Sequence, residues 1–302
     1  MSETMSQASV QTPLPNAAAA QPRTPHALAE AYKRDGYVVL PRHFSADEIA
    51  TITRETSELC RGRLGAFNGI EPGGEDLSEP ELLARYLAIH MPHKLATHMH
   101  AWMSHSKIVP LLTSLIGPNV KCMQSMLFMK GPGNPGQAWH QDEYYIPTRD
   151  RSLCGAWIAL DDATRDNGCL WVIPGSHRTG VLWSQRAHNN PEFDWADESY
   201  GFPYAASDEV AVEVPSGSLV LFNGYLLHRS LKNTTPDKFR RALVYHYMSA
   251  ESFLPWFHRK EFRGWSFGSL DIRDVVMVAG EDPYAYKGIE EINAPFVRPA
   301  KL

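Results

Sequence analysis

The feature that most constrains the fold is a change of pattern after Gly117. From there on, short apolar or alternating runs follow one another, separated by turn residues. The runs are KCMQSMLFMK, LCGAWIAL, GCLWVIP, EVAVEV, SLVLFNGYLLH and RALVYHYM. Short strands at this spacing are typical of a β-sandwich or jelly roll. The sequence therefore predicts a mainly β fold with its core over about 118–250.

The preceding part of the chain has helical spacing instead. HALAEAYKRDG predicts an amphipathic helix that ends at Gly36, and the short β run GYVVLP follows it. Ser45 and Glu48 form a capping-box signature at the start of a second helix. Two more helices are expected over about 81–89 and 95–116. We expect these helices to pack on one side of the β core.

Composition limits the number of domains and the kinds of partner. The chain has 302 residues, and β folds of this length often form one domain. Residues 1–25 are rich in Ala, Ser, Gln and Pro and are predicted to be disordered. We expect a single domain over 26–302, in which 251–302 is a C-terminal extension. The net charge of −5 and the lack of a basic stripe argue against nucleic acid as a partner.

The expected location is the cytoplasm. No apolar run is long enough to span a bilayer, and the N-terminus lacks the basic start and apolar run of a signal peptide. The four cysteines are scattered without a CxxC pair, which is typical of reduced thiols. They are Cys60, Cys122, Cys154 and Cys169.

The stretch WHQDEYYIP places His140 and Asp142 two positions apart. Residues i and i+2 of a strand face the same side, so the imidazole and the carboxylate would point together. Such a pair alone is common by chance, and taken alone it is far more often a polar patch at a strand edge than part of a metal site. A metal site needs at least a third ligand.

His228 is the third candidate ligand, because it ends the apolar strand SLVLFNGYLLH. Two imidazoles and one carboxylate form the facial triad of non-haem Fe(II) oxygenases, which leaves coordination positions open. Those positions can take a bidentate co-substrate and O₂. A structural zinc site would be closed with four ligands and fits less well.

An arginine pair downstream suggests the co-substrate. Fe(II) enzymes of this type commonly use 2-oxoglutarate, whose distal carboxylate suits the planar fork of a guanidinium. Arg240 and Arg241 lie in one predicted strand and point to opposite faces, so only one can bind it directly. The alternative is that both are surface charges beside a strand.

These motifs, taken in order, closely resemble the phytanoyl-CoA dioxygenase family. The resemblance rests on HQD, Trp157, NGCLWVIPGSH, the sequence HRS at 228–230 and FRRA at 239–242, and on the early GYVVLPRHFSADEI. It extends from about Asp35 to about Tyr284. It implies a double-stranded β-helix, which is a cupin-like jelly roll, with helices on one side.

The resemblance also implies roles for single residues. It places Fe(II) at His140, Asp142 and His228, and the 2-oxoglutarate anchor at Arg240, assisted by Ser230. The remaining residues that it places in the 2-oxoglutarate pocket are Trp157, Met126, Lys94 and Gln141. The interval from His228 to Arg240 is one residue longer than in the mammalian acyl-CoA enzymes, which keeps Arg241 open as the anchor.

The expected activity is hydroxylation of an unactivated C–H bond, with O₂ consumed and succinate and CO₂ released. Related halogenases lack the carboxylate that Asp142 supplies, so halogenation is disfavoured. The alternatives are desaturation, epoxidation or rearrangement with the same cofactors, or a non-catalytic cupin-like binding protein. The substrate is expected to be a small apolar or amphipathic molecule, because the long segment 177–210 is aromatic and suggests a lid. The oligomeric state stays open.

Two other clusters have competing interpretations. The histidines at 90, 93, 98, 100 and 105 could form a second metal site, although solvated or capping roles fit their spacing better. The aromatic run from Phe253 to Phe267 is more typical of a core than of a ligand platform.

Overall fold

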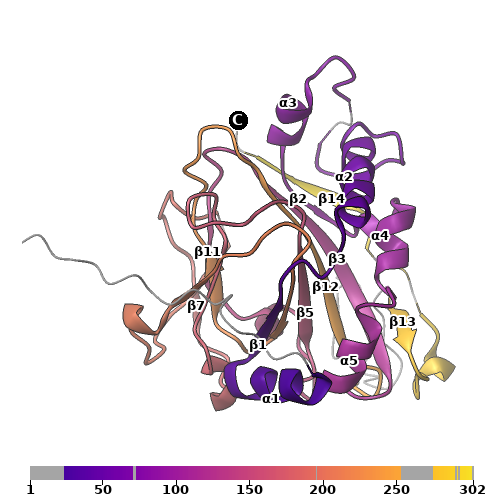
Figure 1. The fold of residues 1–302 in the computed structure, drawn as a ribbon, viewed down its shortest axis with the longest axis vertical. Coiled ribbons are helices and arrows are strands. Elements are labelled where there is room, and N and C mark those ends of the chain that lie inside the picture. Colours follow the sequence, from indigo (N-terminus) through magenta and orange to yellow (C-terminus); the bar gives the residue numbers. More distant parts are fainter. Residues whose placement is uncertain are drawn as a thin grey trace, which may run out of the picture.

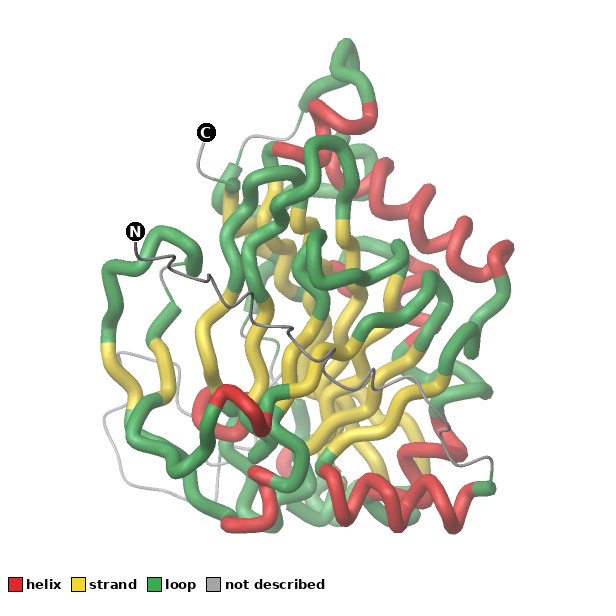
Figure 2. Tube along the Cα trace, turned by 60° about the vertical axis from the view of Figure 1, so that its left-hand side comes forward, coloured by secondary structure: helices red, strands yellow, loops and turns green. Residues whose placement is uncertain are grey.

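Two antiparallel β-sheets face each other, and helices cover the outer face of the larger one (Figures 1 and 2). The computed structural model describes residues 24–70, 73–194, 196–252, 275–289, 291 and 293–300. Nearly all of the predicted disordered tail and the aromatic run from Phe253 to Phe267 lie outside the described residues. Within them, no helix is long and apolar enough to cross a membrane.

Both sheets are built from antiparallel neighbours, which confirms the predicted jelly roll. The larger sheet has the order β1 (Tyr37–Leu40), β10 (Leu219–Asn223), β5 (Cys154–Ala159), β12 (Arg240–Ser249), β3 (Val120–Lys130), β2 (Tyr86–His90) and β14 (Phe296–Pro299), and β13 (Val276–Ala279) also pairs with β3. The smaller sheet has the order β4 (Gln137–His140), β11 (His228–Ser230), β6 (Leu170–Val172) and β9 (Val210–Val212). A separate hairpin-like pair joins β7 (Gln185–Arg186) to β8 (Glu198–Ser199).

Six α-helices lie within the described residues, and some of them begin or end at recognisable capping residues. They are α1 (Pro25–Asp35), α2 (Ala46–Cys60), α3 (Glu79–Ala84), α4 (Thr97–Trp102), α5 (Val109–Leu115) and α6 (Asp142–Tyr145). Short 3₁₀ turns are η1 (Pro92–Lys94), η2 (Ser176–Thr179), η3 (Ala206–Asp208) and η4 (Ala285–Lys287). Gly36 ends α1 with a left-handed φ of 83°, and Ser45 and Glu48 form the predicted capping box of α2.

The two other predicted helices form only in part. Residues 79–84 are helical, but Tyr86–His90 is strand β2, because it pairs with both β3 and β14. Those two neighbours satisfy its backbone and override the local helical spacing. The predicted helix over 95–116 is broken into α4 and α5. Pro110 lies in the first turn of α5, where a proline is tolerated, and cannot lie inside one continuous helix.

Two apolar clusters hold these layers together. One lies between the helices and the larger sheet, and the other lies between the two sheets. Strand β12 is also tied to α4 by hydrogen bonds. The Tyr245 hydroxyl donates to the carbonyl of Met99 at 2.6 Å, and the Tyr247 hydroxyl to that of Met103 at 3.0 Å. The strand that carries Arg240 is therefore fixed from outside the barrel.

Helix α4 has a cap that comes from another helix, and this predicts a large effect of one substitution. The buried Glu55 carboxylate of α2 accepts hydrogen bonds from the backbone N–H groups of His98 and Met99, both at 2.8 Å. Hydrogen bonds to a charged group contribute about 1.5–3 kcal/mol. We expect Glu55→Ala to lower the free energy of unfolding by about 2–3 kcal/mol in urea titrations. Glu58→Ala is the control, because its side chain lies in the same helix, is 42% exposed and pairs only with the equally accessible Arg63. Equal losses in both variants would contradict the capping role.

Candidate metal centre

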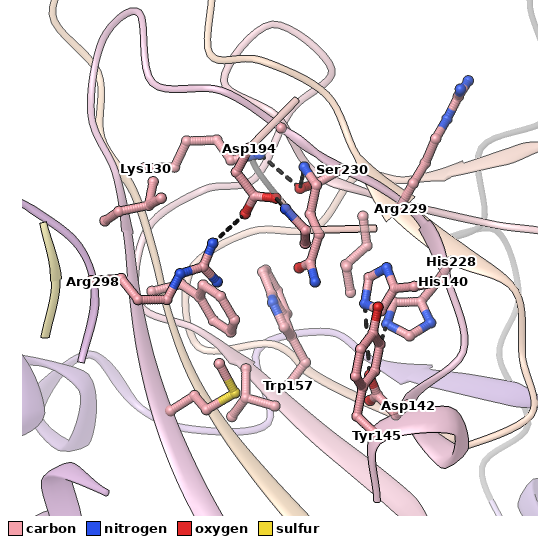
Figure 3. A pocket seen from close by; sticks show the side chains of 18 of the residues that line it. Lys130, His140, Asp142, Tyr145, Trp157, Asp194, His228, Arg229, Ser230 and Arg298 are labelled. Carbon is pink, nitrogen blue, oxygen red and sulfur yellow. Dashed lines mark hydrogen bonds and ion pairs between the residues drawn. The ribbon is translucent and has the colours of Figure 1, made fainter. Parts of the chain in front are cut away.

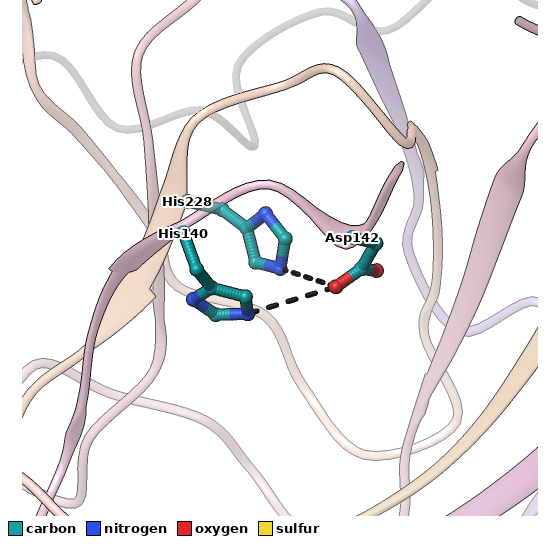
Figure 4. Close-up of side chains that lie close together, drawn as sticks. All are labelled: His140, Asp142 and His228. Carbon is teal, nitrogen blue, oxygen red and sulfur yellow. Dashed lines mark ion pairs between the residues drawn. The ribbon is translucent and has the colours of Figure 1, made fainter. Parts of the chain in front are cut away.

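The predicted ligands come together at the end of the smaller sheet (Figure 4). His140 ends β4 and His228 begins β11, and the two residues are direct partners across these strands. The Nε2 atoms of His140 and His228 lie 3.6 and 3.5 Å from the same Asp142 oxygen, Oδ1. All three ligand atoms lie within 4.8 Å of one another.

The backbone at Gln141 explains why His140 and Asp142 point together. Strand β4 stops at His140, and Asp142 is the first residue of α6, so the pair does not lie within one strand. Gln141 keeps an extended conformation, with φ −129° and ψ 125°. The two-residue alternation therefore continues for one more step, and the predicted common orientation is correct.

Both histidines present a lone pair to the same point. His140 Nδ1 lies 2.8 Å from the carbonyl oxygen of Ala138, and His228 Nδ1 lies 2.9 Å from that of Leu226. A carbonyl only accepts hydrogen bonds, so Nδ1 carries the proton in each ring and Nε2 is free to bind a metal. Adjacent ligands of a metal with bonds of about 2.1 Å lie about 3 Å apart, so the three groups fit one divalent ion.

A further histidine holds the carboxylate in place. His246 Nε2 donates to Asp142 Oδ2 at 2.9 Å, and His246 Nδ1 lies 3.1 Å from the Gln124 amide nitrogen. That nitrogen only donates, so the Gln124 amide sets the tautomer of His246. Asp142 therefore turns Oδ1 towards the metal position, while its Oδ2 accepts the hydrogen bond from His246. Sequence reasoning missed His246, although it lies six residues after Arg240 on the same face of β12.

The charge state of the site suits a cation. Burial alone would raise the pKa of Asp142, but the nearby rings of His228 and His246 more than offset it and hold the pKa below its usual range. Burial, and then His228, lower the pKa of His140 to about 4. At neutral pH the carboxylate is thus ionised and the His140 ring is neutral, which are the states that bind metal.

A cavity of about 620 Å³ extends from these ligands between the sheets (Figure 3). Its floor is the inner face of the larger sheet, where the strand register places Met126 of β3 between His90 of β2 and Val244 of β12. Its apolar lining includes Leu87, Met126, Phe128, Ile146, Trp157, Leu170, Phe222, Val244 and Phe296. Its charged lining includes Lys130, Asp194, Asp197, Arg229, Arg240 and Arg298.

The two candidate anchors face different environments. Arg240 is 4% exposed and lines the cavity, with its guanidinium carbon 5.8 Å from the centre of the Trp157 ring. Burial lowers its pKa to about 10, so it stays charged at neutral pH. Arg241 faces the other way and forms two hydrogen bonds to the Asp161 carboxylate, at 2.9 and 2.7 Å. Of these two arginines, only Arg240 is placed to meet a ligand in the cavity.

A buried lysine lies next to Arg240 and was missed from the sequence. Lys130 is the direct partner of Arg240 across β3 and β12, and it lines the cavity. Its Nζ donates to Ser230 Oγ at 2.7 Å and to the carbonyl of Leu231 at 2.6 Å. Met126 is in the predicted pocket, and even spacing along β3 would have placed Lys130 on the same face.

Five of the predicted pocket residues divide into two groups. Trp157, Met126 and Ser230 line the cavity. Lys94 is not among the lining residues, and its Nζ donates to the carbonyl of Asn293 at 2.6 Å. Gln141 is fully buried outside the cavity, so the structure does not bring it to the co-substrate position.

The Gln141 side chain has a different role, which is to hold the start of segment 177–210. Its amide nitrogen donates to the carbonyls of Val181 and Tyr225, at 2.9 and 2.8 Å. Its amide oxygen accepts from the backbone N–H of Trp183 at 2.8 Å. Gln141, which lies between two metal ligands in the sequence, thus holds the start of segment 177–210 against the site.

The segment 177–210 covers part of the cavity, but none of its described aromatic residues is among those that line it. Phe202 packs against Trp139 and Trp183, with ring centres 6.2 and 6.5 Å apart, and neither Phe202 nor Trp183 lines the cavity. Asp194, Ala196 and Asp197 line it instead. The wall contributed by this segment is therefore largely acidic.

The remaining histidines do not form a second metal site within the described ranges, where the group around Asp142 is the one that could hold an ion. His98 and His105 contact Glu55 and Glu48 instead. Arg229 lines the cavity through part of its chain, but its guanidinium pairs with Glu209 at 2.5 Å on the other side.

The jelly roll, the facial set of two histidines and one carboxylate, and the buried arginine in the cavity define a non-haem iron oxygenase. The phytanoyl-CoA dioxygenase family matches residues 32–242, and the chain belongs to this family. It is accordingly an Fe(II)- and 2-oxoglutarate-dependent dioxygenase, and O₂ is its second co-substrate.

Individual relatives agree with this assignment. A protein named phytanoyl-CoA dioxygenase from Arabidopsis thaliana is 36% identical over 251 residues, which cover 73% of this chain and 87% of the relative. The non-heme monooxygenase ThoJ has the same fold, with a TM-score of 0.62 and 21% identity over 91% of this chain and 88% of its own. The epimerase SnoN, solved with Fe3+, alpha ketoglutarate and nogalamycin RO, has a TM-score of 0.57 and 22% identity over 76% and 85%.

The contact between Asp142 and His246 predicts graded effects on metal binding. Anaerobic Fe(II) with 2-oxoglutarate should give a visible charge-transfer band in the unchanged protein. We expect Asp142→Ala to abolish the band and His246→Ala to weaken Fe(II) binding about 10–100-fold, because the carboxylate loses its orientation. The exposed Asp150→Ala is the control. Full iron content in Asp142→Ala would exclude this residue as a ligand.

His90 predicts an acid-sensitive stability. Burial, and then Arg298 and His246, lower its pKa to about 3, against about 6.5 in an unfolded chain. The unfolded state therefore binds this proton more readily, and stability falls as the pH drops from about 6.5 towards 3. Between pH 7 and 5 the metal-free protein loses free energy of unfolding, and we expect this loss to be about 2 kcal/mol smaller in His90→Phe. Urea unfolding measures this, with the exposed His26→Phe as control, and an unchanged pH profile in His90→Phe would contradict it.

Proposed function

We propose that the protein hydroxylates an unactivated C–H bond of a small apolar or amphipathic molecule. The observation that carries the proposal is one cavity that joins the candidate iron ligands to a buried guanidinium and to an apolar floor. In the reaction, 2-oxoglutarate and O₂ become succinate and CO₂, and the second oxygen atom enters the substrate as a hydroxyl group. The iron bound by His140, Asp142 and His228 supplies the oxidising chemistry.

The protein residues bind and orient the co-substrate. Arg240 offers its charged fork to the distal carboxylate of 2-oxoglutarate, and the neighbouring Ser230 adds a hydroxyl. Lys130 donates a hydrogen bond to Ser230 and holds that hydroxyl in place, while burial and then Arg240 lower the pKa of Lys130 well below its usual value. Trp157 and Met126 contact the carbon chain between the two ends. An anionic co-substrate is thus matched by the Arg240 guanidinium at one end and by the metal at the other.

The cavity lining supports the substrate class. Phe128 of β3 and Phe296 of β14 present apolar surface on the side of the floor away from Trp157. A C–H bond over this surface is held in a largely dry environment, which protects the reaction from water. The retained Asp142 favours hydroxylation over halogenation, because the carboxylate occupies a coordination position that a halide would need.

The arginine pair gives the sharpest test of the co-substrate site. We expect Arg240→Ala to lower kcat/KM for 2-oxoglutarate by about 100-fold or more, because a charge-assisted bidentate contact is lost. Arg241→Ala should change it by less than about threefold, since its partner Asp161 lies outside the cavity. Succinate release across a substrate panel measures both variants. Equal losses would exclude Arg240 as the specific anchor.

The mass of the product tests the reaction outcome. Hydroxylation adds one oxygen atom to the substrate, whereas desaturation removes two hydrogens and rearrangement leaves the mass unchanged. Succinate release without any product across the panel, or no succinate release at all, would count against the proposal.

A further inference from the structure

An ion pair lies across one side of the cavity, and neither of its residues has a role in binding the metal or the co-substrate. Arg298 Nη2 lies 2.6 Å from Asp194 Oδ2, and both residues line the cavity (Figure 3). The side chains are only 12% and 7% exposed, respectively. Taking two charges out of water is costly unless they meet each other, so a pair this buried is sensitive to the loss of either partner.

The two partners are connected to opposite sheets. Arg298 lies in β14, which is the edge strand of the larger sheet. Asp194 belongs to the segment 177–210, which is attached to the smaller sheet at Gly136, directly before its edge strand β4. The backbone N–H of Asp194 donates to the carbonyl of Gly136, and the N–H of Gly136 donates to that of Glu192, both at 2.8 Å. The ion pair therefore joins the two sheet edges on the same side of the jelly roll.

The orientation of the Asp194 carboxylate is set locally. Its Oδ1 accepts a hydrogen bond from the backbone N–H of Ala196 at 3.0 Å, which leaves Oδ2 directed at Arg298. The neighbours Ala196 and Asp197 also line the cavity. Any movement of Asp194 would thus move the wall that this segment contributes.

Arg298 also lies outside the part of the chain that the family match covers, which ends at residue 242. The metal ligands and Arg240 lie inside that range, whereas Phe296 and Arg298 reach the same cavity from the C-terminal strand. The shared part of the chain supplies the iron and co-substrate end, and a part beyond it completes the opposite wall.

We propose that Asp194 and Arg298 are positioning residues whose ion pair acts as a clasp between the two sheet edges. The closed clasp fixes the wall formed by Asp194, Ala196 and Asp197 against β14, and it limits the size of the molecules that the cavity admits. Opening the clasp lets ligands enter and leave faster. The size limit on substrates rests on the proposed hydroxylase function, whereas the movement of the wall and the passage of 2-oxoglutarate do not.

Two measurements without a substrate test the clasp. Hydrogen exchange read by mass spectrometry should show the peptide over 192–198 exchanging about tenfold faster in Arg298→Gln and in Asp194→Asn, with β10 and β12 unchanged. Stopped-flow recording of the anaerobic Fe(II)–2-oxoglutarate band should show association and dissociation rates both rising about tenfold, while Kd stays within about twofold. Arg298→Lys keeps the charge and should restore most of the wild-type behaviour.

The matched control is Arg241→Gln, which breaks the comparably buried pair with Asp161 outside the cavity. It should change neither the exchange at 192–198 nor the two rates. Unchanged exchange in both clasp variants would overturn the proposal. Faster dissociation with weaker binding and an unchanged association rate would also overturn it, because that pattern assigns Arg298 to the co-substrate site. Faster exchange throughout the jelly roll would overturn it as well, because it reports only general destabilisation.

If the clasp variants behave as expected, the hydroxylase assay adds one more readout. The largest substrate accepted from the panel should increase in size in Arg298→Gln. A panel that yields no product in the unchanged protein counts against the proposed function, and it leaves the exchange and 2-oxoglutarate results on the clasp intact.

Discussion

The pairing of β4 with β11 is the constraint on which the rest of the site depends. It sets His140 directly opposite His228, with ring centres 4.0 Å apart. Each ring is oriented by the carbonyl two residues before it, so both lone pairs converge without help from a metal. Asp142 then needs only one extended residue after the strand to reach the same point. The metal position is thus prepared by backbone geometry more than by side-chain packing.

The larger sheet positions the side chains that orient the metal-binding carboxylate and anchor the co-substrate. Strand β12 carries Arg240 at one end and His246 further along, and even spacing puts both on the inner face. His246 reaches Asp142, whereas Arg240 meets Lys130 on the neighbouring strand. One rigid strand therefore sets the orientation of the metal-binding carboxylate and the position of the co-substrate anchor. Its attachment to α4 through two tyrosines explains why helices outside the barrel matter to the site.

One end of the cavity is built wholly from residues within the family match, and the other end also uses a strand beyond it. The iron ligands, Trp157 and Arg240 lie within the range common to the phytanoyl-CoA dioxygenase family. The far wall combines β14 with the acidic part of segment 177–210, joined by Asp194 and Arg298. Strand β14 therefore brings a part of the chain beyond the family match to this wall, whereas segment 177–210 lies within the match.

The sequence by itself determined the class of fold, the three candidate ligands, the end of the first helix at Gly36 and the capped start of the second helix at Ser45. These depend on residue type and on spacing along the chain, which are properties a single sequence displays. Only the tertiary structure decided that Tyr86–His90 is a strand, because its backbone partners come from segments far away. It also put Arg240, the anchor that the resemblance implied, on the inner face, and Arg241, which the sequence had left open, on the outer face. Lys130, His246 and the Asp194–Arg298 pair gain their roles from contacts between residues about 100 positions apart, and spacing along one strand carries no information about such partners.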